Sequence, residues 1–241
     1  MKAFINNSLF LVFFVLVAGP AHGVEKPSLA CLLEPNELVE FSSEIPGIIE
    51  QMDVSRGDWV SEGQVLAKLK SGVSEARVAL AQARVEFGQR KAQRNQELYR
   101  KDLLSMHEKD EMETEIQLAQ LELVEAIELM KLRTIRSTVD GVVVERKGAA
   151  GEYVGEDPFI TVAKINPLNV EVIVPVAYFG TIKNGQFAQV HLDEPVGGSY
   201  RAKVVIIDRV IDAASSTFRV RLELPNQKLN LPAGIKCQVD F

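Results

Sequence analysis

The chain has 241 residues, with 33 acidic and 27 basic side chains and a net charge of −6 at pH 7. Hydrophobic residues make up 46% and charged residues 25%, which is typical of a globular protein and excludes low-complexity and collagen-like chains. The acidic balance argues against a broad nucleic-acid-binding surface. Three His and two Cys are too few and too scattered for a zinc or haem framework, so we expect no metal and no cofactor.

Residues 1–23 have the pattern of a cleaved secretory signal peptide. Lys2 gives a positive start, an apolar run extends from Leu9 to Val17, and small residues lead to a cleavage point after Gly23. A membrane anchor is the alternative, but a spanning helix needs ~20 apolar residues and this run is half that length. The sequence therefore predicts an exported mature chain.

Two cysteines in an oxidising compartment can form a disulfide. Cys31 lies near the start of the mature chain, and Cys237 lies four residues before its end. If the terminal strands are neighbours, a Cys31–Cys237 disulfide would close nearly the whole chain. The alternative is that both are small buried apolar side chains, and thiol counting would distinguish the two.

Residues 44–69 recur as residues 138–163, at an offset of 94 residues and without a gap. Each copy alternates apolar and polar residues and contains turn glycines, which predicts short strands. One copy alone is too small to bury a core, so we expect the two to close on each other as one flattened β-sandwich. The matched pairs are Gly47–Gly141, Gly57–Gly151, Trp59–Tyr153, Val60–Val154, Val65–Phe159 and Leu66–Ile160.

Between the copies, residues 71–133 change to helical periodicity. Helix-forming residues dominate, and Gly88 costs the first helix ~1 kcal/mol relative to Ala, which the partner helix must offset. A narrow apolar seam with charged flanks predicts an antiparallel coiled coil with a break near residues 101–105 and arms of about 42 Å. A helical domain packed on the sandwich would need a wider stripe, so a projecting stalk is favoured. The expected seam residues are Val73, Ala76, Leu80, Ala83 and Phe87 in the first helix, and Met112, Ile116, Ala119, Leu123, Ala126 and Met130 in the second.

After residue 165 the chain is predicted to be all β. Short apolar runs at 170–176, 188–192, 202–208 and 218–224 are separated by Pro, Gly and Asn turns, which indicates a small closed barrel. Residues 30–41 would add a strand to it. The whole chain is therefore nested, with the sandwich inside the barrel and the hairpin inside the sandwich.

This nested order resembles the periplasmic adaptor subunits, or membrane fusion proteins, of Gram-negative efflux pumps (HlyD-like, with RND-type efflux adaptors). Residues 46–69, PGIIEQMDVSRGDWVSEGQVLAKL, look like the family's first lipoyl half. Residues 213–239, AASSTFRVRLELPNQKLNLPAGIKCQV, look like its barrel signature. The matching signature positions are Thr217, Asn226, Pro232 and Gly234.

The resemblance implies a fold that is mainly β with an inserted α-helical coiled-coil hairpin. A lipoyl-like β-sandwich and a small β-barrel would make an elongated chain. The expected divisions are a signal peptide at 1–23, a β-barrel domain at 24–43 and 166–241, a lipoyl-like domain at 44–70 and 134–165, and an α-helical hairpin at 71–133.

At the expected hairpin tip, Arg94, Leu98 and Ser105 have the spacing by which this family engages a TolC-type outer-membrane channel. Arg94 and Leu98 are four residues apart and share one helix face. Arg can make a forked, charge-assisted contact, and Leu98 adds an apolar contact. Ser105 can cap the returning helix while offering its hydroxyl outward to the channel. The alternative is a solvated Arg, a seam Leu and a simple helix cap.

The resemblance implies a non-enzymatic periplasmic adaptor that links an inner-membrane exporter to the channel. Copies of the chain would form a ring. The exporter would be of the RND class, with an ATP-driven (ABC) exporter as the alternative. Family members usually continue into a membrane-proximal domain, which leaves the grip on the exporter open. The sequence contains no Met-rich segment, so a copper-exporting member of the family is not indicated.

Two alternatives come from other classes of protein. A lipoyl- or biotin-carrying enzyme domain would modify Lys68 or Lys70, but the hairpin replaces the tight loop that a ligase reads, and no activated nucleophile is evident. A non-transport envelope coiled-coil protein would keep the stalk but would not need the tip residues.

Overall fold

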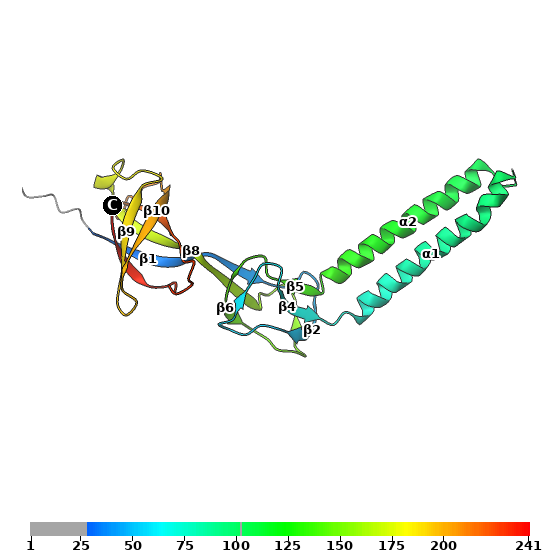
Figure 1. Cartoon of the computed structure of the whole chain (residues 1–241), viewed down its shortest axis with the longest axis horizontal. Helices are drawn as coiled ribbons and strands as arrows, with labels where there is room; N and C mark the ends of the chain where they lie inside the picture. Colours follow the sequence, from blue (N-terminus) through cyan, green and yellow to red (C-terminus); the bar gives the residue numbers. More distant parts are fainter. Residues whose placement is uncertain (1–27, 102) are drawn as a thin grey trace, which may run out of the picture.

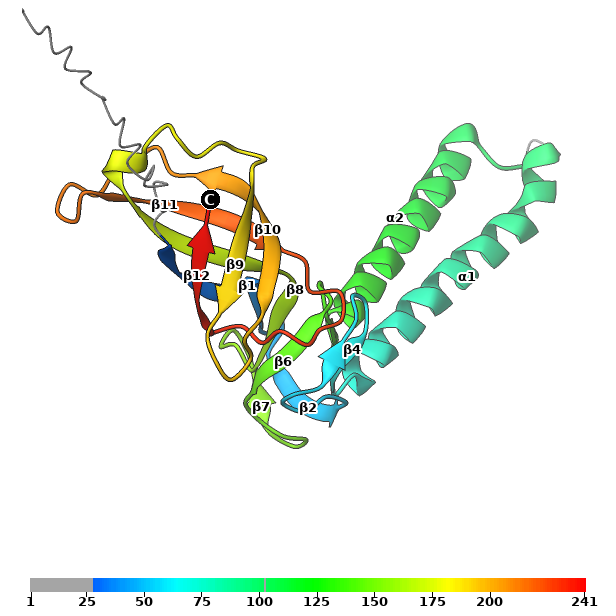
Figure 2. The same ribbon diagram turned by 60° about the vertical axis from the view of Figure 1, so that its left-hand side comes forward.

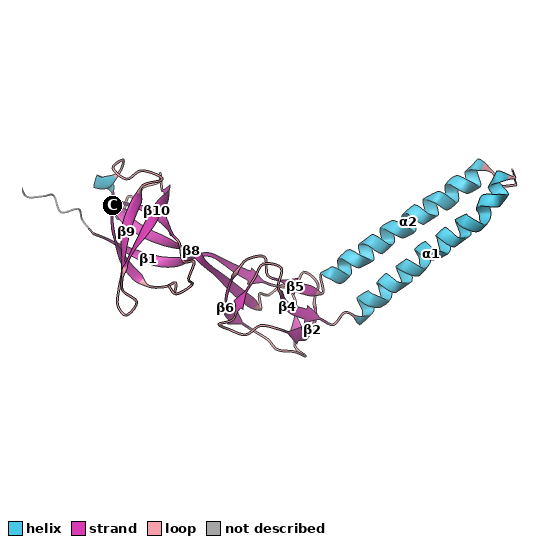
Figure 3. Ribbon diagram, viewed as in Figure 1, coloured by secondary structure: helices cyan, strands magenta, loops and turns pink. Residues whose placement is uncertain are grey.

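The computed structural model describes residues 28–101 and 103–241, so the predicted signal peptide lies outside the described residues. A β-barrel, a β-sandwich and a helical hairpin follow one another along the long axis (Figure 1). Strands make up the first two units, and the two long helices lie only in the hairpin (Figure 3). Among the described residues, no helix has the length and apolar character that crossing a membrane requires. The prediction of a mainly β chain with a barrel and two helices is confirmed.

Six antiparallel strands form the barrel. In spatial order they are β1 (Leu29–Phe41), β12 (Lys236–Asp240), β9 (Phe187–Leu192), β10 (Ser199–Ile207), β11 (Thr217–Leu224) and β8 (Ile160–Pro175). β8 pairs back with β1, which closes the barrel. A 3₁₀ turn, η1 (Val176–Tyr178), follows β8.

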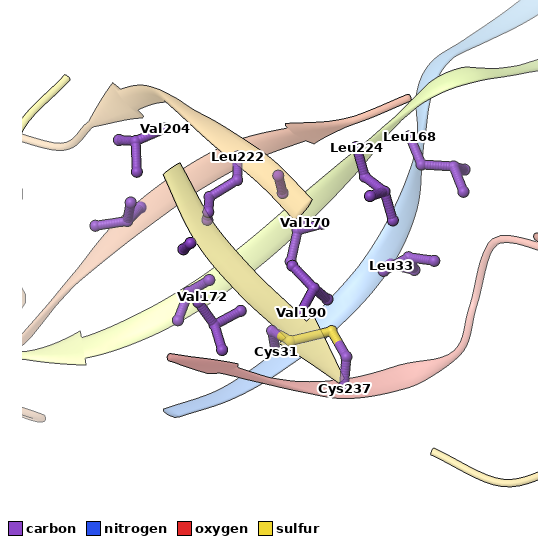
Figure 4. Packing of buried hydrophobic residues seen from close by; sticks show 14 of the residues in the cluster. Cys31, Leu33, Leu168, Val170, Val172, Val190, Val204, Leu222, Leu224 and Cys237 are labelled. Carbon is purple, nitrogen blue, oxygen red and sulfur yellow. A yellow bond between two sulfur atoms is a disulfide. The ribbon is translucent and has the colours of Figure 1, made fainter. Parts of the chain in front are cut away.

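The barrel core is built from the inward-facing residues of these strands. Val170, Val172 and Leu222 are fully buried in it (Figure 4). Cys31 in β1 and Cys237 in β12 are directly paired across the two strands and form a disulfide, with their Cα atoms 4.8 Å apart. The last strand is therefore covalently attached to the first, and both cysteines are also buried.

β1 and β8 run through both β units as one long ribbon (Figure 1). The first half of β1 places Leu33 in the barrel core, whereas the second half places Phe41 in the sandwich core. Phe41 falls on the barrel side of the division expected at residue 43, but it packs in the sandwich. The two β units are thus joined by paired strands rather than by a flexible linker.

The sandwich consists of two facing layers. One layer is a four-stranded sheet, and the other is formed by two strands that extend the long sheet beyond β8. The four-stranded sheet is β5 (Thr134–Arg136), β4 (Val65–Leu69), β2 (Gly47–Met52) and β7 (Tyr153–Val154); the facing strands are β6 (Gly141–Arg146) and β3 (Trp59–Val60).

The two copies of the repeat exchange strands with each other in equivalent ways. Gly47 of β2 pairs with Val154 of β7, and Gly141 of β6 pairs with Val60 of β3. Adding the offset of 94 residues to Gly47 gives Gly141, and subtracting it from Val154 gives Val60, so the two pairings are equivalent. Each copy therefore completes the other, which is the closure that the repeat predicted.

The turns of the two copies are also equivalent. The Gly57 amide donates to the Val143 carbonyl at 2.8 Å, and the Gly151 amide donates to the Ile49 carbonyl at 2.8 Å. Gly57 and Gly151 have φ angles of +94° and +95°, a region that side chains with a Cβ rarely adopt. The turn glycines that recur in the sequence are therefore required by the backbone.

Helices α1 (Gly72–Arg100) and α2 (Met106–Lys131) lie side by side and antiparallel, with the break between them where it was expected (Figure 2). The expected seam of α2 is confirmed, because all six of its residues are half-buried, as Lys109 and Ile127 also are, and Met112 and Ile116 contact α1. Coiled-coil geometry of the pair stays a prediction.

The expected seam of α1 is wrong. Val73, Leu80 and Phe87 are 72%, 59% and 58% exposed, and Ala76 and Ala83 are exposed as well. These residues form an outer stripe on α1 that has no partner among the described residues.

The observed seam of α1 is shifted by one or two positions and consists of smaller side chains. Ser74, Ala81 and Val85 are buried in it. At Gly88 an added Cβ would lie 3.0 Å from Cγ1 of Ile116. Close approach of the helices thus selects the small residues, and the contact with Ile116 explains why a helix-weakening glycine is present.

Candidate functional site at the hairpin tip

Arg94 and Leu98 are on the exposed surface of the last two turns of α1. The guanidinium of Arg94 makes no ion pair or hydrogen bond to any described residue, and Leu98 is 42% exposed. Arg94 is also seven residues beyond Phe87, so it continues the line of the α1 outer stripe. Leu98 is therefore not a seam residue, and both side chains are available to another molecule.

Ser105 is the N-cap of α2, as expected. Its Oγ accepts a hydrogen bond from the Glu108 amide at 3.2 Å, and the Glu108 carboxylate accepts from the Ser105 amide at 2.8 Å, which completes a capping box. The Ser105 hydroxyl also donates to that carboxylate at 2.8 Å. These hydrogen bonds, from the backbone of Ser105 first and its side chain second, lower the pKa of Glu108. The hydroxyl proton is therefore used within the cap and does not point to a partner.

Two further apolar residues at the tip were missed by the sequence analysis. Leu103 in the connecting loop is 70% exposed, and Met106 at the start of α2 is 60% exposed. Together with Leu98 they give the tip an apolar apex beside the charge of Arg94. The sequence signal for this apex was the presence of apolar residues, Leu103 and Met106, in or directly after the short connection between the helices.

Below the apex, the contact between the helices is mostly polar. The Tyr99 hydroxyl lies 3.7 Å from Sδ of Met106, and Nδ2 of Asn95 donates to Sδ of Met112 at 3.2 Å. Nζ of Lys109 lies 5.0 Å from the centre of the Tyr99 ring. We call these five residues the distal seam. A groove of about 290 Å³ runs along it.

Nearer the sandwich, ion pairs flank the seam on its solvent side. Arg84 pairs with Glu122 at 2.7 Å and Lys91 with Glu115 at 3.0 Å, each across the two helices. Because these side chains are largely exposed, each pair contributes ~0.5 kcal/mol or less to stability. They fix the antiparallel register more than they add stability.

A Ser–His–Asp chain of hydrogen bonds, also missed by the sequence analysis, crosses the outward face of the barrel. Nδ1 of His191 lies 2.8 Å from the Ser199 hydroxyl, and Nε2 lies 3.1 Å from an Asp240 carboxylate oxygen. The side chains of His191 and Asp240 are 44% and 42% exposed. The arrangement joins three neighbouring strands and is not shielded as a reaction site would be.

No group of three or more His, Cys, Asp or Glu side chains suited to a metal ion occurs within residues 28–101 and 103–241. Lys68 lies within β4, and Lys70 lies between β4 and α1. The chain passes from this point directly into the hairpin, whereas a modified Lys requires a tight exposed loop.

Two family models match nearly all of the described chain. The model of the CzcB-like barrel-sandwich hybrid domain matches residues 37–164, more than half of the chain. The model of the CusB-like β-barrel domain matches residues 168–241. The boundary between them falls within β8, the strand that the two β units share.

One curated relative is an uncharacterized protein from Haemophilus influenzae, 24% identical over 193 residues. The match covers 79% of this chain and 50% of the relative, so the chain spans half of that protein's length.

Solved structures share the fold. A putative efflux transporter from Bacteroides eggerthii has a TM-score of 0.72 at 17% identity, covering 88% of this chain and 67% of that one. A MacA–MexA chimera with the Pseudomonas aeruginosa MexA α-hairpin has a TM-score of 0.77 at 19% identity, covering 89% and 79%. The membrane fusion protein Spr0693 of Streptococcus pneumoniae R6 has a TM-score of 0.71 at 17% identity, covering 88% and 100%.

Proposed function

The chain belongs to the membrane fusion protein family, the periplasmic adaptors of efflux pumps, and from this premise we propose its specific role. It links an inner-membrane exporter to a TolC-type outer-membrane channel and carries out no reaction of its own. The observation that carries the proposal is the hairpin, which projects from the sandwich (Figure 1). Near its tip Arg94 is exposed and has no ion pair or hydrogen bond among the described residues, and it lies beside an apolar apex.

The tip supplies both parts of a docking contact. The free guanidinium of Arg94 can donate two parallel hydrogen bonds to carbonyl or carboxylate oxygens at a helix end of the channel. Leu98, Leu103 and Met106 supply apolar area that is buried on contact. Ser105 acts indirectly, because its capping box holds the first turn of α2 and thereby the position of the apex.

The exporter binds at the barrel end, which lies opposite the hairpin along the long axis (Figure 1). An RND-type exporter is favoured over an ATP-driven one because the barrel matches the CusB-like model of RND-type barrels. An exported chain located in the periplasm, with its predicted signal peptide removed, fits this position between two membranes.

Copies of the chain associate side by side through their hairpins. The outer stripe of α1 needs an apolar partner, and α2 exposes Leu118, Leu121 and Val124 at 58%, 59% and 54%. These residues lie about as far from the sandwich as Leu80 and Phe87 do, since each helix rises ~1.5 Å per residue. Hairpins that point the same way can therefore pack α1 of one copy against α2 of the next.

The charges of the two helices favour the same arrangement. α1 contains six basic and three acidic residues, whereas α2 contains two basic and eight acidic residues. Contact between α1 and α2 of neighbouring copies brings opposite charges together, and contact between identical helices does not. An interface in which α1 of each copy contacts α2 of the next is heterologous. It closes into a ring when the rotation between neighbouring copies allows it.

Arg94→Asp tests the docking role, with Gln89→Asp as the control. Gln89 is also exposed and unpaired among the described residues of the same helix, but it lies on the side away from Phe87 and the outer stripe. We expect R94D to abolish crosslinking to the channel and lower tolerance to exported compounds, and Q89D to leave both unchanged. Equal crosslinking by R94D and wild type would overturn the proposal, as would equal losses in the two variants.

Leu80→Asp tests the assembly role by sedimentation. A buried carboxylate in an apolar contact is strongly unfavourable, so we expect L80D to stay a monomer at concentrations where wild type associates. Gln89→Asp is the control, because Gln89 is two residues from Phe87 and lies on the other side of the helix. Association of L80D at the wild-type concentration would contradict this interface.

A further inference from the structure

We propose that Met106 and Met112 are oxidation sites through which a two-electron oxidant, such as a peroxide, loosens the distal seam. The consequence for channel docking rests on the proposed function, whereas the loosening itself does not. The site lies in the distal half of the hairpin and includes the hydrogen bonds of Tyr99 and Asn95 to the two sulfur atoms.

The two sulfur atoms occupy the positions where the helices would otherwise be least attached. Nearer the sandwich, the seam is apolar and includes Ala81 and Val85, which are 8% and 5% exposed. In the distal half no residue of either helix is buried. The described side-chain contacts between the helices there are the thioether hydrogen bonds, the Lys109–Tyr99 contact and, farther from the apex, the exposed Lys91–Glu115 ion pair at 3.0 Å. A change at sulfur therefore affects most of the contacts nearest the tip.

Both sulfur atoms are accessible to a small oxidant. The Met106 side chain is 60% exposed at the apex. Met112 is half-buried, but it lines the groove of about 290 Å³ beside Asn95, Tyr99 and Lys109, which is large enough to admit a peroxide molecule. Met130, at the sandwich end of the α2 seam, has no hydrogen-bond donor on its sulfur among the described residues.

The reaction is an oxygen transfer. The thioether sulfur attacks one oxygen of hydrogen peroxide, the O–O bond breaks and an S–O bond forms. The sulfur is oxidised by two electrons to the sulfoxide, and the peroxide is reduced to water. The product is polar, larger than the thioether and reversible by a sulfoxide reductase.

Oxidation changes the distal seam in a defined way. A sulfoxide accepts hydrogen bonds through its oxygen, which extends beyond the sulfur, so the donors on Asn95 and Tyr99 can no longer hold the helices at the present spacing. At Met112 the added oxygen also binds water at the contact between the helices. The tip therefore separates, and the relative position of Arg94 and the apex is no longer fixed.

The experiment treats the whole protein with hydrogen peroxide and follows it by peptide mass spectrometry and hydrogen exchange. Loss of one hydrogen bond corresponds to about a tenfold change in local opening, so we expect about tenfold faster exchange in residues 92–112 once Met112 is oxidised. Met112→Leu with Met106→Leu, which keeps the side-chain volume, should show no peroxide response. Met112→Gln, a polar mimic of the sulfoxide, should exchange fast without oxidant, and Met130→Leu should respond like wild type.

Two results would overturn the inference. One is unchanged exchange of residues 92–112 in protein whose Met106 and Met112 are fully oxidised. The other is an equal response in the double Leu variant, which would place the sensitive group elsewhere. Crosslinking to the channel separates this inference from the proposed function. If R94D crosslinks like wild type, the docking role of the tip fails, even where oxidation loosens the distal seam. If R94D reduces crosslinking but oxidation does not, oxidation does not regulate docking.

Discussion

The sandwich and the hairpin are both built by pairing two segments, yet they are stabilised very differently. The sandwich buries Ile49, Val60 and Val143 completely between two copies that exchange strands. The hairpin buries three residues in α1 and none in α2. The first therefore unfolds as one unit, whereas the second is a thin element that opens locally at lower cost. The residues proposed to dock lie in the element that opens more easily.

The contrast predicts that equivalent truncations will differ most between these two regions. Leu66→Ala removes a fully buried side chain between the two copies and should cost about 3 to 4 kcal/mol of unfolding free energy. Val85→Ala, at the best-buried apolar position of the hairpin, should cost about 1 kcal/mol because water can enter the space. Urea unfolding measures both, with the single Trp59 reporting on the sandwich and helical circular dichroism on the hairpin.

Equal losses for the two variants would remove the distinction. So would a Val85→Ala effect seen first in the fluorescence of Trp59, since this would mean that the hairpin and the sandwich unfold together.

A second prediction uses the repeat itself, because equivalent glycines meet different neighbours. A Cβ at Gly141 would collide with the Ala163 carbonyl oxygen and lie 2.8 Å from Cγ1 of Val162, which the sheet holds in place. A Cβ at Gly47 would lie 2.7 Å from Nη1 of Arg133, the end of a long side chain that can move. We expect Gly141→Ala to cost about 2 to 3 kcal/mol and Gly47→Ala about 1 kcal/mol in urea unfolding.

The opposite order of the two losses would mean that Arg133 is the rigid neighbour. Its guanidinium donates to the Pro46 carbonyl at 3.2 Å, so Arg133→Lys with Gly47→Ala is the matched test of how freely that side chain moves.

The repeat could be predicted from the sequence because its signals are local and occur twice. Turn glycines such as Gly57 and alternating strands specify each copy, and the constant offset shows that the copies are equivalent. The Cys31–Cys237 pairing was left open, because it depends on which strands become neighbours when the barrel closes. That closure joins residues 206 positions apart, a distance at which sequence patterns carry no information on pairing.

The seam of α1 could not be chosen from periodicity alone. Two apolar stripes run along this helix, and the one with the larger side chains, including Leu80 and Phe87, was predicted to be buried. The helices instead approach closely over Ser74, Ala81 and Gly88, and the larger residues remain outside. In a hairpin that has only one neighbouring helix, hydrophobicity identifies two candidate faces, and the packing distance selects between them.

The tip was predicted in its positions but not in its chemistry. The spacing of Arg94, Leu98 and Ser105 was available from the sequence, and the structure exposes the first two and places Ser105 at the cap. Glu108 completes that cap three residues later, and the sequence analysis did not use it. A capping box is a local motif that the spacing of Ser105 and Glu108 encodes, whereas the seam of α1 depends on how closely the two helices pack.

The smallest predicted effect is a pH dependence confined to the tip. Hydrogen bonds from the backbone and side chain of Ser105 lower the pKa of Glu108 from its ordinary value of 4.5. A carboxyl group whose pKa is lower in the folded chain stabilises it above the ordinary pKa, and this contribution is lost as the pH falls through the lowered value. Amide exchange of residues 105–109, corrected for its intrinsic pH dependence, should therefore accelerate in wild type below pH 4.5.

Glu108→Gln makes the comparison decisive. A Gln side chain can still accept the hydrogen bond from the Ser105 amide but does not titrate, so its tip should exchange at the same corrected rate across this range. Glu111→Gln, an exposed residue of the same helix without a partner among the described residues, should keep the wild-type response. If amide exchange in E108Q accelerated with acid as much as in wild type, the acid would be acting on another group. The capping box would then not make the tip more acid-sensitive than the sandwich.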